Sequence, residues 1–138
     1  MTRAFVADSS VGLAWVHPAQ ATDLTRGLLQ DVESGALVHV AVLWPLEIAN
    51  ALLVAVRRKL VTDAQRKAAL ALLPALNVII DSEGPLLAWT TISDLAATHN
   101  LSVYDACYLE LALRNTLPLA SRDEPLRAAA KKAGVELL

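Results

Sequence analysis

The segment Ala4-Phe-Val-Ala7-Asp8 decides how the rest of the chain is interpreted. Its four apolar residues are too few for a core helix, so they predict a short buried strand that ends directly at a carboxylate. A second apolar run, β-branched and located at residues 37–42, predicts another strand. Between them, apolar residues recur at helical spacing over 23–33, and Gly35 closes the predicted helix.

This alternation of strands and helices continues to the C-terminus. Because strands that alternate with helices indicate a mainly parallel sheet, we expect an α/β fold with about four to five strands and helices on both faces. A length of 138 residues suits a single core, so residues 1–138 are expected to form one domain. Further helices are predicted at residues 44–59, from Thr62 as the N-cap to about residue 73, at roughly 85–98, at 103–114 and at 123–132. Further strands are predicted at 78–80 and 117–120, with a closing edge strand at 135–137.

The composition excludes several classes of protein. A hydrophobic fraction of 55% excludes a disordered chain, and a charged fraction of only 19% leaves apolar surface for a partner. No apolar run is long enough to cross a bilayer, the N-terminal residues do not form a secretory signal, and the single cysteine excludes an internal disulfide framework. We therefore expect a cytoplasmic protein with no membrane partner. The net charge of −2 neither indicates nor excludes nucleic-acid binding.

Four acidic residues lie where the predicted strands lead into helices. Asp8 and Asp123 follow predicted strands, while Glu47 and Asp105 lie at the starts of predicted helices. In open α/β sheets, ligands bind beyond the carboxyl ends of the strands, so these side chains can converge on one crevice. Carboxylates are ligands that Mg²⁺ prefers in proteins. The four acids are therefore candidate metal ligands and catalytic residues.

The same acids have a simpler interpretation as helix caps. Acidic side chains in the first turn of a helix accept hydrogen bonds from free N–H groups and interact favourably with the helix dipole. The segment Ser102-Val-Tyr-Asp105 also matches a capping box. Taken one at a time, the acids fit capping more readily than metal binding. Spacing alone leaves both interpretations open.

The local sequences around the acids carry a family resemblance. In their order along the chain they resemble the motifs of PIN-domain ribonucleases, and within that family the VapC toxins of type II toxin–antitoxin pairs. The resemblance covers nearly the whole chain. It is carried by Phe5-Val-Ala-Asp8-Ser-Ser10, Pro45-Leu-Glu47-Ile-Ala-Asn50-Ala-Leu, Leu101-Ser-Val-Tyr-Asp105-Ala-Cys-Tyr-Leu and Leu119-Ala-Ser-Arg-Asp123-Glu-Pro-Leu-Arg.

The resemblance implies a function and a set of partners. The four acids would surround one or two divalent ions, Mg²⁺ or in its place Mn²⁺, and the chain would hydrolyse RNA. A cognate antitoxin protein and a homodimer are implied as well. In the stretches 49–56 and 68–76, apolar residues occur on more than one face of the predicted helix, which also favours association with another protein chain.

The resemblance extends to residues that support the acids. Ser10 and Ser121 match small hydroxyl residues of the family's first and last motifs, although both also fit as turn or cap hydroxyls. Asn50 matches a polar residue one turn after the family's glutamate, where it would support Glu47. Arg122, next to Asp123, is the candidate for contact with a substrate phosphate.

Two other functions compete with the ribonuclease. A phosphoacceptor receiver domain also joins a parallel sheet to a few acids, and Asp81 directly after strand 78–80 fits its phosphorylated residue. However, a receiver requires an acidic pair after the first strand, where this chain has Asp8-Ser-Ser. It also requires a lysine after the last strand, and no lysine fits that position. A PIN fold that serves only as a binding module is not favoured, because no acid of the four is missing.

Overall fold

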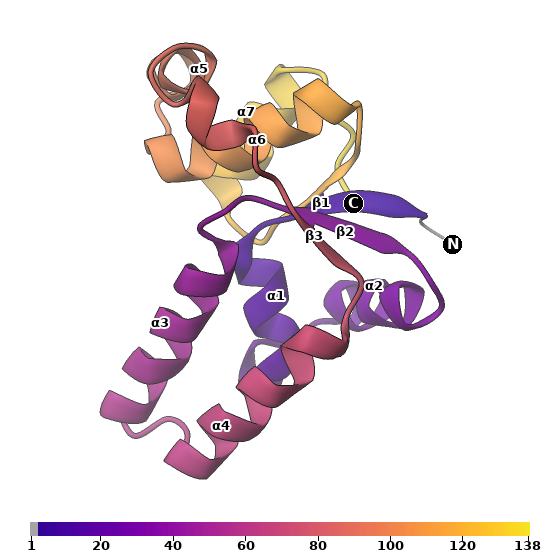
Figure 1. Cartoon of the computed structure of the whole chain (residues 1–138), viewed down its shortest axis with the longest axis vertical. Helices are drawn as coiled ribbons and strands as arrows, with labels where there is room; N and C mark the ends of the chain where they lie inside the picture. Colours follow the sequence, from indigo (N-terminus) through magenta and orange to yellow (C-terminus); the bar gives the residue numbers. More distant parts are fainter. Residues whose placement is uncertain (1–2) are drawn as a thin grey trace.

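The computed structural model describes residues 3–138 and contains one parallel four-stranded sheet (Figure 1). The strands β1 (Ala4–Ala7), β2 (Leu37–Val40), β3 (Val78–Ile80) and β4 (Leu119–Ala120) follow the order β3-β2-β1-β4. All three neighbouring pairs are parallel. The predicted parallel α/β fold is therefore confirmed, and β1 lies inside the sheet with its C-terminal end at Asp8.

Helices cover both faces of the sheet, as predicted (Figure 1). One face carries α1 (Ser9–Val16), α2 (Asp23–Glu33), α3 (Trp44–Arg57) and α4 (Asp63–Leu72), while the other carries α5 (Thr91–His99), α6 (Val103–Asn115) and α7 (Glu124–Lys132). The helices α3 and α4 extend away from the sheet as a pair. Within residues 3–138, no helix is both long enough and apolar enough to span a membrane.

The core forms on both faces of β1. Phe5, Val6 and Ala7 are completely buried, which explains why this strand is a continuous apolar run rather than an alternating one. Phe5 contacts the ring of Trp15 edge-on, with ring centroids 6.4 Å apart. The strand that carries Asp8 is thus fixed from both sides.

Helix α1 occupies residues 9–16, for which the sequence pattern predicts no element. Its buried residues include neighbours such as Val11 and Gly12, so the one-sided helical spacing used to recognise helices is absent. Gly12 is needed for close packing on α3, because a Cβ there would lie 2.6 Å from Ile48 Cδ1 and 2.8 Å from Trp44 Cε2. The Trp44 indole also donates a hydrogen bond to the Asp8 carbonyl at 3.0 Å.

Three further predictions need correction. The predicted helix 85–98 is divided into a 3-10 turn, Gly84–Leu87, and α5, because the backbone of Thr90 leaves the helical region with φ −123° and ψ −100°. The predicted strand 117–120 contains only Leu119–Ala120. Residues 135–137 form no strand but pair with β4 through a single parallel bridge between Leu137 and Leu119. The remaining predicted elements are present with ends shifted by no more than two residues.

Candidate active site

Asp8 lies at the C-terminal end of β1 and caps α1. One carboxylate oxygen accepts hydrogen bonds from the Ser10 hydroxyl at 2.5 Å and the Val11 N–H at 3.2 Å, and the other accepts from the Ser121 hydroxyl at 2.5 Å. Only 4% of Asp8 is exposed. Burial raises the pKa of Asp8, and the hydrogen bonds from Ser10 and Ser121 offset only part of that rise. Both serines thus hold a buried carboxylate in one orientation.

Glu47 lies in the first turn of α3 and is held by a residue from α6. The Tyr108 hydroxyl donates a hydrogen bond of 2.6 Å to Glu47 Oε1, across 61 residues of sequence. Burial raises the pKa of Glu47 although this hydrogen bond lowers it. Tyr108 is not among the site residues predicted from the sequence. The available signal is its position three residues after Asp105, on the same side of a helix.

Asp105 and Asp123 occupy the starts of α6 and α7. The Asp105 N–H donates to the Ser102 hydroxyl at 3.0 Å, and Asp123 caps α7 by accepting from the Leu126 N–H at 2.9 Å. Burial, and then the charge of Asp123, raise the pKa of Asp105. The capping interpretation is therefore correct for Asp8 and Asp123. Because each cap uses only part of a carboxylate, it does not exclude a second role.

The four carboxylates interact with one another electrostatically. After burial and hydrogen bonding, the charge of Asp105 raises the pKa of both Asp8 and Glu47, and the charge of Asp8 also raises that of Glu47. Among residues 3–138, none of the four forms an ion pair with a lysine, arginine or histidine. The cluster therefore combines desolvated negative charges without a compensating positive charge from the protein.

The donor set suits a hard divalent cation, which binds carboxylate oxygens. Within the described part of the chain, however, no three acidic, histidine or cysteine side chains converge closely enough to hold a metal. The acids influence one another's pKa without converging on one point, because electrostatic effects act over longer distances than coordination bonds. Asp8, Glu47, Asp105 and Asp123 are thus neighbours whose side chains are not drawn together around a single point.

The remaining predicted site residues differ in their surroundings. The Arg122 N–H donates to the Ser10 hydroxyl at 2.9 Å, which places its backbone beside Asp8. The Arg122 side chain reaches Gln20, which is not among the site residues predicted from the sequence. Asn50 is exposed, and its side chain forms no hydrogen bond with any described residue.

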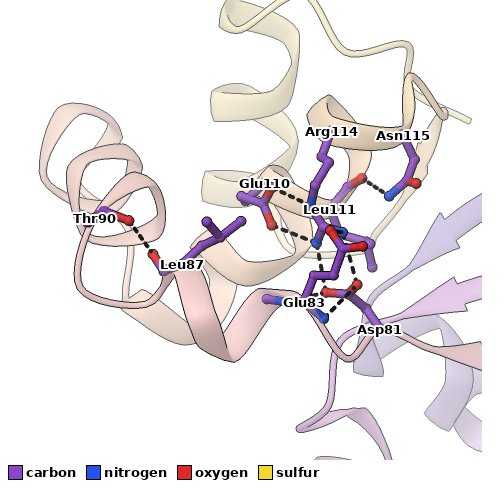
Figure 2. Close-up of polar contacts among 9 residues, drawn as sticks. Asp81, Glu83, Leu87, Thr90, Glu110, Leu111, Arg114 and Asn115 are labelled. Atoms are coloured by element: carbon purple, nitrogen blue, oxygen red, sulfur yellow. Dashed lines mark hydrogen bonds and ion pairs between the residues drawn. The ribbon is translucent and has the colours of Figure 1, made fainter.

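Asp81, the residue on which the receiver alternative depends, belongs to a separate ion-pair cluster (Figure 2). Arg114 donates to Asp81 at 2.7 Å, and also contacts Glu110 at 2.8 Å and Glu83 at 3.2 Å. Although burial raises the pKa of Asp81, the hydrogen bonds from Arg114 and Gly84 outweigh it and leave the pKa lowered. A carboxylate bound in this way is not presented to a phosphoryl donor, which argues against the receiver.

Comparison with known proteins identifies the family. The sequence model of the PIN domain family matches residues 5–132, which is nearly the whole chain. The chain belongs to the PIN-domain family. PIN domains are nucleases that generally use divalent metal ions. No curated protein sequence gives a significant match.

Solved structures share the fold of this PIN domain at low sequence identity. PAE2754 from Pyrobaculum aerophilum has a TM-score of 0.71 at 21% identity, over 99% of this chain and 83% of that one. VapBC2 from Rickettsia felis, bound to a DNA fragment from its promoter, gives 0.67 at 9% identity, over 98% and 97%. VapBC-5 from Mycobacterium tuberculosis, described as a member of the VapBC family of toxin–antitoxin systems, gives 0.57 at 23% identity, over 99% and 98%.

Proposed function

We propose that this chain, with residues 1–138 as one PIN domain, is an Mg²⁺-dependent endoribonuclease. The observation that carries the proposal is the cluster of Asp8, Glu47, Asp105 and Asp123, which lack a cationic partner in the described residues. These residues would hold Mg²⁺, or Mn²⁺ in its place. The chemistry that such an ion would supply there is polarisation of the phosphodiester and activation of a water for in-line attack.

The neighbouring side chains have positioning roles in this proposal. Ser10 and Ser121 hold the two oxygens of Asp8, and Tyr108 holds Glu47, so that few side-chain torsions remain to be fixed when a cation binds. Asn50 is close enough in sequence to support Glu47 from the next turn of α3. Arg122 is proposed to contact a phosphate of the RNA, because its backbone is held at the site by Ser10.

The expected result with purified protein is metal-dependent cleavage of RNA. A structured RNA should be cut in Mg²⁺ or Mn²⁺ and remain intact in chelator, since a site built on carboxylates would depend on the bound cation to activate water. Gel analysis of the products measures this directly, and a DNA of the same sequence tests the substrate class. Cleavage that persists after thorough chelation would falsify the metal requirement.

We also propose that the chain is the toxin of a type II toxin–antitoxin pair. The family membership and the fold similarity to VapBC proteins support this proposal. The helix α4 adds a surface for an antitoxin, because Ala69 is its only buried residue and Leu72 is largely exposed. An apolar pocket of about 220 Å³ lies between this helix and the end of α1.

A second apolar surface supports a homodimer. Trp89 is 97% exposed and Leu86, on the same segment, is 82% exposed. Beside this segment, an apolar pocket of about 230 Å³ includes Val42, Val103 and Tyr104 in its lining. Tryptophan is enriched at the centres of protein interfaces. We therefore assign this surface, rather than α4, to the contact between two copies.

The two surfaces can be tested separately by light scattering at micromolar concentration. We expect a dimer for the parent protein and a monomer for Trp89→Glu, because a charge would be placed in the apolar contact. Leu72→Glu on α4 is the matched control and should remain a dimer. A monomeric parent would rule out the dimer, and a monomeric Leu72→Glu with a dimeric Trp89→Glu would move the contact to α4.

A further inference from the structure

Arg122 is held both at its backbone and at the tip of its side chain. Its N–H donates to the Ser10 hydroxyl, which in turn donates to Asp8, so the backbone is tied to the acid cluster. Its Nη1 donates to Gln20 twice, to the backbone oxygen at 2.7 Å and to the side-chain oxygen at 3.0 Å. Gln20 ends the short 3-10 turn Pro18–Gln20 that follows α1. A long, solvent-exposed arginine would otherwise sample many rotamers.

These contacts use one edge of the guanidinium and leave the other free. Two hydrogen bonds account for both N–H groups of Nη1. Within residues 3–138, the Nε and Nη2 groups of Arg122 have no hydrogen-bond acceptor and no acidic partner. The Nε–Nη2 edge is a planar pair of donors that matches two oxygens of a phosphate. The fixed half of the guanidinium therefore orients the free half.

We propose that Gln20 is a positioning residue that holds the Nε–Nη2 edge of Arg122 as a binding site for an RNA phosphate flanking the scissile one. The occupant is a phosphodiester because the site offers two parallel charged donors beside the proposed nuclease centre. This inference rests on the proposed function. It extends that function by assigning a partner to Arg122 and a role to Gln20, which belongs to neither the acid cluster nor the segments that resemble PIN ribonucleases.

Binding of a short fluorescein-labelled single-stranded RNA in chelator tests the site without cleavage. Arg122→Ala should weaken binding roughly tenfold and reduce the slope of log affinity against log salt by about 0.7, the value for one lost phosphate contact on a single strand. Arg122→Lys keeps the charge and should retain the slope while binding more weakly than the parent. Arg58→Ala, an exposed arginine at the far end of α3, removes the same charge and should change neither quantity.

Gln20→Ala tests the positioning role. The variant removes the 3.0 Å side-chain contact with Arg122 and keeps the 2.7 Å backbone contact. The charge of Arg122 remains, so the salt slope should stay that of the parent, while affinity falls roughly threefold because the guanidinium is less ordered. In the Arg122→Ala background, Gln20→Ala should cause no further loss, since a residue that acts through Arg122 has nothing left to position. Gln30→Ala on α2 is the matched glutamine control and should bind RNA as the parent does.

The outcomes distinguish this inference from the proposed function. An equal loss from Gln20→Ala with and without Arg122 would overturn the positioning role, and unchanged affinity and slope in Arg122→Ala would overturn the phosphate site. A parent protein that does not bind the RNA in chelator would also overturn it. Failure to cleave in Mg²⁺ with these binding effects intact would instead reject the nuclease proposal and leave the phosphate site in place.

Discussion

Replacement of Asp8 or Asp105 with asparagine should abolish RNA cleavage without lowering the melting temperature of the metal-free protein. Burial and the neighbouring carboxylates raise the pKa of both residues, so their charged forms destabilise the fold. Asparagine removes the charge and keeps the shape. At position 8 it also keeps the hydrogen bonds, because a serine hydroxyl can rotate to accept from the amide. Active sites commonly carry such strain at the expense of stability.

The response to Mg²⁺ provides the second half of this prediction. A ligand that binds only the folded state stabilises it by about 2.7 kcal/mol at a hundred times its dissociation constant. The parent should therefore melt at a higher temperature in Mg²⁺ than in chelator. The asparagine variants, with one ligand oxygen replaced by an amide nitrogen, should show a smaller rise. Thermal melts of parent and variants in both conditions measure the effect.

Alanine variants separate metal binding from helix capping. Asp8→Ala loses the capping hydrogen bond to the Val11 N–H, so in chelator it should lower the free energy of unfolding by about 1 kcal/mol. Asp8→Asn should not cause this loss, because asparagine is itself a good cap. The matched control is Asp63→Asn, an exposed acid in the first turn of α4, which should leave cleavage and the Mg²⁺ response unchanged. Full cleavage and a parental metal response in both Asp8→Asn and Asp105→Asn would mean that the acids are structural only.

The elements that sequence predicts best are those whose patterns arise from burial. The strand β1 is covered on both faces, so its apolar run is unbroken, and its position directly before Asp8 could be predicted. Helix α1 is also buried on several sides, and its fit depends on Gly12 accepting the side chains of Trp44 and Ile48. Because those side chains come from another helix, no local pattern in residues 9–16 reports the contact.

The site divides in the same way between local and distant information. The four acids could be selected as candidates because Asp8 and Asp123 follow predicted strands, Glu47 and Asp105 begin predicted helices, and all four lie in segments that resemble family motifs. The contacts that orient the side chains of the site could not be predicted from the sequence. Tyr108 reaches Glu47 across 61 residues, and Arg122 reaches Gln20 across 102. Such pairs depend on the packing of elements, which a single sequence does not specify.

Replacement of Arg114 with alanine should lower the free energy of unfolding by about 3 kcal/mol at pH 7. Arg114 is the shared partner of Asp81, Glu110 and Glu83 (Figure 2), and its side chain joins the end of β3 to α6. The side chains of Glu110 and Asp81 are only 4% and 12% exposed. Without Arg114 these two carboxylates would remain buried without a cation, which is far more costly than the loss of a surface ion pair.

Glu83→Ala provides the matched control within the same cluster. The Glu83 side chain is 70% exposed, so its contact with Arg114 is screened by water and its loss should cost about 0.5 kcal/mol or less. Urea unfolding of the parent, Arg114→Ala and Glu83→Ala at pH 7 gives the comparison. Similar losses for the two variants would show that burial of Glu110 and Asp81 does not determine the contribution of the cluster.

The contribution of Asp81 to the pH dependence of stability should have opposite signs in Arg114→Ala and in the parent. In the parent the pKa of Asp81 is lowered, so its contribution to stability is complete above its ordinary value of 3.8 and is lost as the pH falls through the folded-state pKa. In the variant the Gly84 and Glu83 N–H groups still lower the pKa of Asp81, but we expect burial, the largest influence on this carboxyl, to exceed them and raise that pKa above 3.8. The variant should therefore gain stability relative to the parent between pH 7 and about pH 5, because the folded state then takes up more protons than the unfolded chain. A difference in unfolding free energy that stays constant over this range would show that Asp81 is not desolvated once Arg114 is removed.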